Sequence, residues 1–279
     1  MPTQQHTTPF VVRPARPDDD PGIADVARRN AQPESQSGAD AAYTAHLRDR
    51  GRLLVADRSG RIIGYAATVG IGAASMLTDL FVDPETHGSG TGKALLSALW
   101  PAATRDSERF TFASHDPRAL SVYVRAGLTP WWPLLYLRGR PAALPQPGVG
   151  VARVTPGEAG RAEARLTGTD REGDLALLAG GDPAGGLVMT RDGQVVAAGA
   201  ADAGNLAHLA CPDPATAADA VVAGLRALQA GDVSVCLPGP HPAVPALLEG
   251  GFRIVDFDVH MAARSDLLAT SWAYSPSLG

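Results

Sequence analysis

The sequence predicts an α/β fold of the mixed α+β type, built as two tandem units that are each a mostly antiparallel mixed sheet flanked by helices. The first observation is a repeated hairpin, because the apolar runs 54–66 and 187–199 are each broken by an Arg-x-Gly turn. The second is that the same order of elements follows each hairpin. The third is composition: 279 residues, 45% of them hydrophobic and 19% charged, indicate a globular chain long enough for two domains.

Each half is expected to open with a short strand and a helical segment, at 11–30 and 151–168. After the hairpin, each half continues with an apolar strand, a Pro-containing turn, a helix, another strand, and a short helix that leads into a last strand. In the first half, the segments before that last strand are 75–82, 83–84, 92–103, 109–115 and 116–128. In the second half they are 205–211, 212–214, 217–230, 232–238 and 241–252. Gly127 and Gly251 stand just past the short helices, where a left-handed cap is expected.

The boundary between the halves is expected in the Pro/Gly-rich stretch 139–149, which lacks hydrophobic periodicity. The sequence therefore predicts one domain at 10–138 and a second at 150–264. The C-terminal tail, 265–279, shows no pattern that predicts a structure.

Charge and cysteine usage exclude several classes of protein. A net charge of −5 gives no indication of nucleic-acid binding, and no apolar run approaches the roughly 20 residues that cross a membrane. The first residues lack the basic and apolar regions of a signal peptide, so a cytoplasmic protein is expected. Cys211 and Cys236 belong to no CxxC pair, and no His/Cys cluster has zinc spacing, so no metal site is predicted.

The stretch from His87 to Lys93, HGSGTGK, looks like a phosphate-binding loop. A loop of the ATP type needs a glycine five residues before the Gly-Lys pair and a Ser or Thr after it. His87 stands at the first of these positions and Ala94 at the second, where the magnesium ligand belongs. The dinucleotide pattern GxGxxG fails as well, because Lys93 replaces its third glycine. Even so, closely spaced glycines at a helix start let backbone N–H groups and the helix dipole hold an anion without a metal.

Two motifs in the first half resemble the GNAT family of N-acetyltransferases. That family's cofactor loop has the pattern V-x-P followed by Gln/Arg-x-x-Gly-x-Gly/Ala, and it is matched by Val82, Pro84, Gly90 and Gly92, with His87 at the Gln/Arg position. The later family segment, Asn-x-x-Ala followed by Tyr and Gly-Phe, is matched in outline by Asp116, Ala119, Tyr123 and Gly127-Leu128. Asp116 can cap the short helix as Asn would. The resemblance covers residues 10–138.

The resemblance implies that the cofactor is acetyl-CoA (coenzyme A with its acetyl group), held between two diverging strands. It assigns cofactor contacts to residues of the third strand, the loop and the short helix, namely Leu80, Phe81, Val82, His87, Gly88, Ser89, Gly90, Thr91, Gly92, Lys93 and Asp116. An acceptor amine would attack the thioester directly, with Tyr123 as the general acid for the departing thiolate. Asp79, His115 or an ordered water are the alternatives for the general base.

Several alternatives stay open. The aromatic residues Trp131, Trp132 and Tyr136 either line an acceptor pocket or anchor the following strand. The loop position of the second half lacks glycine and carries Asp213, and Leu247 replaces the tyrosine, so a degenerate GNAT-like domain is expected there.

The expected acceptor is a small-molecule or peptide amine, and a homodimer is the generic expectation. An acyl-CoA sensor without turnover is the alternative to an enzyme.

Overall fold

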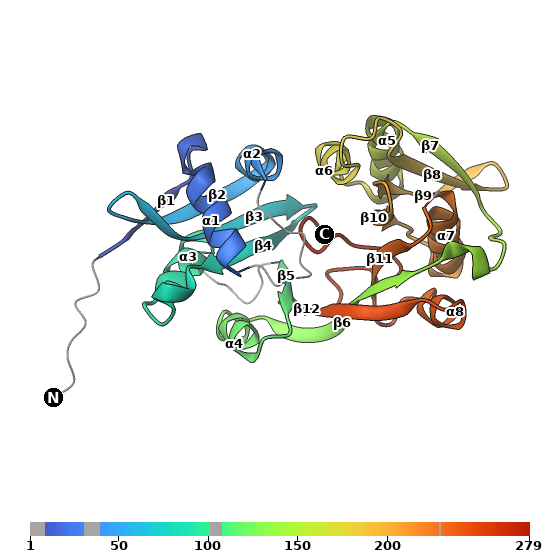
Figure 1. The fold of residues 1–279 in the computed structure, drawn as a ribbon. Coiled ribbons are helices and arrows are strands. Elements are labelled where there is room, and N and C mark those ends of the chain that lie inside the picture. Colours follow the sequence, from blue (N-terminus) through green and yellow to red (C-terminus); the bar gives the residue numbers. More distant parts are fainter. Residues whose placement is uncertain (1–8, 31–39, 101–107, 229) are drawn as a thin grey trace. The chain divides into compact units, whose positions relative to one another are not determined.

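The computed structural model describes residues 9–30, 40–100, 108–228 and 230–279 (Figure 1). The chain divides into two compact units. Unit 1 comprises residues 1–70 and 75–107, and unit 2 comprises residues 71–74 and 108–279. The predicted fold class is confirmed, since each unit combines a sheet with flanking helices. Within these ranges, no helix has the length and hydropathy that a membrane crossing requires.

Unit 1 holds a sheet with the strand order β1-β2-β3-β4. Its strands are β1 (Val11–Pro14), β2 (Gly51–Arg58), β3 (Arg61–Ile71) and β4 (Ala74–Val82). Its helices are α1 (Asp20–Asn30), α2 (Ala41–Arg50) and α3 (Thr91–Leu99), with short 3₁₀ turns η1 (Pro17–Asp19) and η2 (Pro84–Thr86). The predicted hairpin of β2 and β3 is present, and its turn places Ser59 and Gly60 at φ values of 53° and 87°. Such a turn has the twist that two antiparallel strands need.

Unit 2 holds the strand order β5-β12-β6-β11-β10-β9-β8-β7. The strands are β5 (Arg109–Ser114), β6 (Thr129–Gly139), β7 (Gly150–Val154), β8 (Gly186–Arg191), β9 (Gln194–Ala201), β10 (Asn205–Ala210), β11 (Val233–Pro238) and β12 (Arg253–Ala262). The helices are α4 (Pro117–Arg125), α5 (Pro156–Thr167), α6 (Glu172–Leu178), α7 (Pro214–Ala227) and α8 (Val244–Glu249), with the 3₁₀ turn η3 (Pro141–Ala143).

The last strand of each half pairs with a strand of the other half. β6, from the first half, pairs antiparallel with β11, while β12, from the second half, inserts between β5 and β6. The packing units therefore do not coincide with the halves of the sequence repeat. β5, α4 and β6 precede the predicted linker but pack into unit 2.

The core of unit 2 lies on both faces of its sheet. α7 and α8 cover one face, where Val221, Leu225 and Leu247 pack against Leu187 and Val235. On the other face, a smaller apolar cluster joins Ala159 of α5 and Leu175 of α6 to Ala200 of β9. The alternation of side chains along a strand produces these two faces.

Candidate functional site

The glycine-rich loop of unit 1 connects η2 to α3. Gly90 is the N-cap residue of α3 and has φ 83° and ψ 0°, and Gly88 has φ 81°. Both values lie in the left-handed region, where a side chain is strained. No side chain in the described part of the chain caps the first turn of α3. The backbone N–H groups at the start of α3, and the positive end of the helix dipole, are therefore not covered by side chains of Gly88 or Gly90. Such a helix start can bind an anion.

His87 is tied to the end of β4. Its Nε2 lies 3.1 Å from the carbonyl oxygen of Val82, to which it donates a hydrogen bond. Asn30 Nδ2 donates to the same carbonyl at 3.1 Å. Local geometry thus accounts for a histidine at this position, since the ring holds the loop against the strand from which it leaves.

Asp83, in the turn after β4, is a buried anchor for the same strand end. Its side chain is 1% exposed, and its Oδ2 lies 2.6 Å from Arg61 and 3.4 Å from Arg29. Burial alone would raise the pKa of this carboxyl, but the backbone N–H of Glu85 and the Arg61 guanidinium hold the pKa below its usual value.

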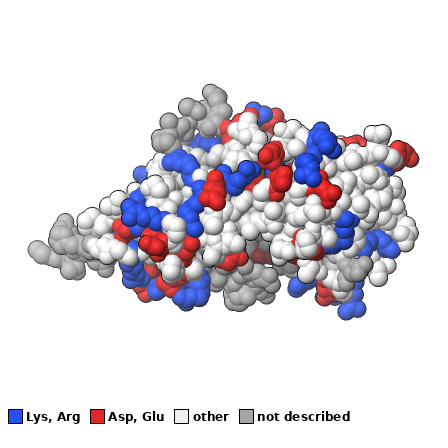
Figure 2. Space-filling model, turned by 90° about the horizontal axis from the view of Figure 1, so that it is seen from above, with Lys and Arg blue, Asp and Glu red and all other residues white. Residues whose placement is uncertain are grey.

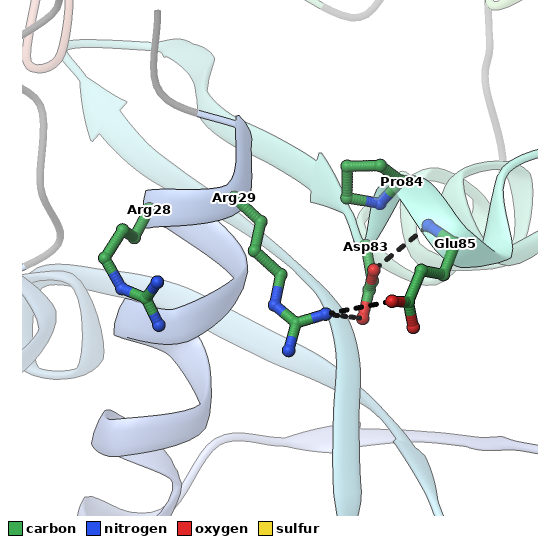
Figure 3. Close-up of a pocket in the computed structure, with 5 residues that line it drawn as sticks. All are labelled: Arg28, Arg29, Asp83, Pro84 and Glu85. Atoms are coloured by element: carbon green, nitrogen blue, oxygen red, sulfur yellow. Dashed lines mark hydrogen bonds and ion pairs between the residues drawn. The ribbon is translucent and has the colours of Figure 1, made fainter. Parts of the chain in front are cut away.

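A surface hollow beside this anchor is lined by Arg28, Arg29, Asp83, Pro84 and Glu85 (Figure 3). Arg29 points toward the two carboxylates, whereas Arg28 points away from them and pairs with Asp25. The charged side chains of the hollow thus pair with one another or with neighbouring residues of the protein. We interpret these ion pairs as structural contacts that join α1 to η2. On the face shown in Figure 2, basic and acidic side chains likewise lie next to one another.

Asp79, the first candidate for the base, is buried in β4. Its Oδ2 accepts a hydrogen bond from the Tyr43 hydroxyl at 2.7 Å, and its Oδ1 lies 3.5 Å from the Tyr65 hydroxyl. Burial raises the pKa of Asp79, and the tyrosine hydroxyls oppose the rise. The sequence pattern gives no indication of either tyrosine. Tyr43 lies on α2, a helix that the repeat pattern did not predict.

The remaining cofactor-contact candidates of unit 1 lie along β4 and the loop. Leu80, Phe81 and Val82 are half-buried at the end of the strand. Ser89 and Thr91 exchange a hydroxyl hydrogen bond of 2.8 Å, and Gly92 and Lys93 lie in the first turn of α3. The structure therefore gathers these residues and Asp79 within one unit.

The other candidates belong to unit 2. Asp116 caps α4, with Oδ1 accepting from the Arg118 backbone N–H at 2.8 Å, so its predicted capping role is confirmed. The Arg118 side chain and backbone lower the pKa of Asp116 to about 2. Tyr123 lies on α4 and is 8% exposed. His115 follows β5, is exposed, and stacks on Phe257 with ring centroids 5.0 Å apart.

The aromatic residues after α4 lie in or beside the strand network. Trp132 packs on the ring of His260 with centroids 4.2 Å apart, and the Tyr136 hydroxyl donates to Asp258 at 2.6 Å. Trp131 is 42% exposed, and its Nε1 bonds the carbonyl of Ala262. For Trp132, the structure favours the anchoring role.

The second half differs at the corresponding helix start. Asp213 is the N-cap of α7, and its carboxylate accepts from Ala215 N at 3.0 Å and from Thr216 Oγ1 at 2.7 Å. The carboxylate of Asp213 therefore caps the first turn of α7, whereas the N-cap residue of α3 is a glycine and provides no such cap. Leu247, at the tyrosine position, is completely buried in the core.

Comparison with known proteins accords with this geometry. Residues 24–131 match the model of the family described as "Acetyltransferase (GNAT) domain". The first half of the chain is therefore similar to GNAT domains. The search of curated proteins gives no match.

Three solved structures share the GNAT fold along nearly the whole chain. An assigned acetyltransferase from Pyrococcus horikoshii superposes with a TM-score of 0.72 at 13% identity, covering 100% of this chain and 99% of that one. A GCN5-related N-acetyltransferase from Sphaerobacter thermophilus gives 0.58 at 16%, covering 93% and 98%. A tandem GNAT protein from the clavulanic acid biosynthesis pathway gives 0.61 at 13%, covering 92% and 100%. At these identities the likeness establishes the fold alone.

Proposed function

We propose that the protein is an N-acetyltransferase that transfers the acetyl group of acetyl-CoA to the primary amine of a small molecule or peptide. The observation that carries the proposal is the start of α3, where Gly88 and Gly90 leave an uncapped helix N-terminus open. This arrangement fits a pyrophosphate and needs no metal. The loop, the strand end and the helix all lie within the residues that match the GNAT domain model, which supports the proposal.

Acetyl-CoA would supply a thioester whose carbonyl carbon is open to attack by an amine. A new N–C bond forms as the C–S bond breaks, and the amine loses one proton. In this proposal, Tyr123 gives its hydroxyl proton to the departing sulfur, because a phenol can protonate a thiolate transiently when the two are adjacent. Asp79 is the candidate to receive the amine proton, and burial raises its pKa above the usual carboxyl value, which makes it a better proton acceptor.

The proposal is tested by following release of free coenzyme A thiol from acetyl-CoA against a panel of small amines and peptides. Turnover with at least one amine, and none without amine, is expected. Tight binding of coenzyme A with no thiol release for any amine would instead indicate an acyl-CoA sensor.

Replacing Gly90 by alanine is expected to raise the KM for acetyl-CoA at least about tenfold, because a methyl group would stand before the helix N-terminus and the left-handed φ would be strained. Gly60 provides a matched control. It has φ 87° in the β2–β3 turn, and an added Cβ there meets no atom within 4 Å, as at Gly90. Both variants should lose about 1 kcal/mol of stability, but Gly60→Ala should keep the wild-type KM. Equal KM changes would contradict a cofactor role for the loop.

Replacing Tyr123 by phenylalanine is expected to lower kcat at least about tenfold while the KM for acetyl-CoA changes little. The ring stays in place, so the unfolding temperature should remain close to that of the wild type. Steady-state kinetics at saturating acetyl-CoA measure the effect. An unchanged kcat would remove the general-acid role and leave the rest of the proposal standing.

A further inference from the structure

Two neighbouring strands of unit 2, β10 and β11, pair only at their beginnings. They run parallel and are in register at Asn205–Ser234 and Leu206–Val235. Farther along, Leu209 exchanges two backbone hydrogen bonds with Ala273, of 3.1 and 3.0 Å. The carbonyl of Cys236 on β11 accepts the backbone N–H of Tyr274 at 3.1 Å. The chain's own tail therefore lies in the opening between the two strands, which we call the strand gap.

Side chains fix the tail at the beginning of this segment. The Ser271 hydroxyl donates to the carbonyl of Cys211 at 2.8 Å, just past β10. His241 Nε2 lies 3.1 Å from the Ser271 carbonyl and donates to it. Both Ser271 and His241 are buried, at 4% and 1% exposure. The entry of the tail into the strand gap is thus specified by polar contacts and does not rest on apolar packing alone.

A buried arginine holds the other end of the tail. Arg171, 2% exposed, donates to the main-chain oxygens of Leu278 and Gly279, the latter at 3.0 Å. Its Nε also bonds Asp174 at 3.1 Å. A buried guanidinium is costly unless its N–H groups are paired, so the tail oxygens complete a set of partners that Asp174 alone does not supply.

The contacts along the tail are made mainly by its backbone. Ala273 and Tyr274 contribute N–H or C=O groups to the strand gap, and Leu278 and Gly279 contribute oxygens to Arg171. A site of this kind recognises an extended chain that carries amide groups, as when a peptide adds a strand to a sheet.

We propose that the strand gap and Arg171 form a binding site for an extended peptide backbone, and that residues 271–279 occupy this site in cis. An occupied gap excludes any other amide-bearing chain from the second half. The pantetheine arm of coenzyme A is one such chain.

The first test uses a variant that ends at Thr270 and a labelled synthetic peptide of residues 271–279, with binding followed by fluorescence anisotropy. The shortened chain is expected to bind the peptide. The full chain should bind it at least about 100-fold more weakly, because its own tail competes at a high effective concentration. A matched peptide with proline in place of Ala273 lacks the N–H that donates to Leu209 and should bind at least about fivefold more weakly. A folded shortened chain that binds neither peptide, or both equally, would overturn the proposal.

The second test uses the full chain and does not depend on whether the shortened variant folds. Hydrogen exchange should show the amides of Ala273 and Tyr274 protected to the same degree as that of Leu209, since the three belong to one hydrogen-bonded segment. Exchange of the tail amides at the rate of an unstructured peptide, while β10 stays protected, would show that the gap is not occupied and the proposal is wrong.

Discussion

Replacing Arg171 by methionine is expected to lower the free energy of unfolding of unit 2 by about 3–5 kcal/mol. The arginine is nearly fully buried between the carboxylate of Asp174 and the main-chain oxygens of Leu278 and Gly279. Removing the guanidinium deprives the Asp174 carboxylate and the two main-chain oxygens of the buried donor that they share. Arg171 also lies 3.4 Å from the ring of His208, whose Nε2 is 3.1 Å from Oε1 of the buried Glu163. The substitution therefore disturbs a group of buried polar contacts and not only the pair with Asp174.

Urea unfolding followed by tryptophan fluorescence measures this change, because Trp131, Trp132 and Trp272 all belong to unit 2. Arg140 offers a matched control. Its pair with Asp232 is exposed, with side-chain exposures of 81% and 59%, and Arg140→Met should cost less than about 1 kcal/mol. Similar losses for the two variants would contradict the assigned structural role of Arg171.

Acidification from pH 6.5 to about pH 5 is expected to destabilise unit 2 by about 2 kcal/mol. Burial lowers the pKa of His260 to about 3 and that of His241 to about 4. As the pH falls below 6.5, the unfolded chain takes up protons before the folded protein does. Each histidine therefore costs about 1.6 kcal/mol of stability between pH 6.5 and pH 5. Asp258 acts in the opposite direction, because burial raises its pKa to about 6, but it recovers only about 1.4 kcal/mol by pH 5.

Replacing His260 by phenylalanine isolates one of these two contributions. The imidazole packs among Phe110, Phe112 and Trp132, and neither ring nitrogen has a hydrogen-bond partner in the described part of the chain. The variant should be at least as stable as the wild type at pH 7 and lose about 1.4 kcal/mol less per pH unit below 6.5. Urea unfolding at pH 7, 6 and 5 measures the slopes. An unchanged slope for His260→Phe would refute the assignment.

Local features of the first half could be predicted from the sequence because short-range stereochemistry determines them. Gly127 just past a short helix indicates a left-handed residue, and its φ of 89° confirms that conformation. Asp116 in front of a proline and an apolar run indicates a helix cap, which is also confirmed. The predicted helix from 92 is found as α3, although residues 101–103 of that prediction lie outside the described residues. The roles of Tyr123 and of the cofactor-contact residues stay predictions.

The features that escaped prediction depend on contacts between segments far apart in the sequence. The order of elements is the same whether β6 pairs within its own half or with β11, so the repeat pattern could not reveal the exchange. The tail has no hydrophobic period because its backbone and a few side chains hold it, and main-chain groups leave no signature in a sequence. The tyrosines that bond Asp79 likewise come from separate elements, α2 and β3.

The exchange of final strands determines when the protein can finish folding during its synthesis. β5 ends at Ser114, but its partner β12 begins only at Arg253. A ribosome adding roughly 5–20 residues per second makes that partner several seconds to half a minute later. During this interval, the edge of β5 that β12 covers in the folded protein still lacks this partner and can pair wrongly with other strands. The nascent first half therefore cannot complete its sheet as it emerges, and chaperones that shield exposed strand edges should bind it in this interval.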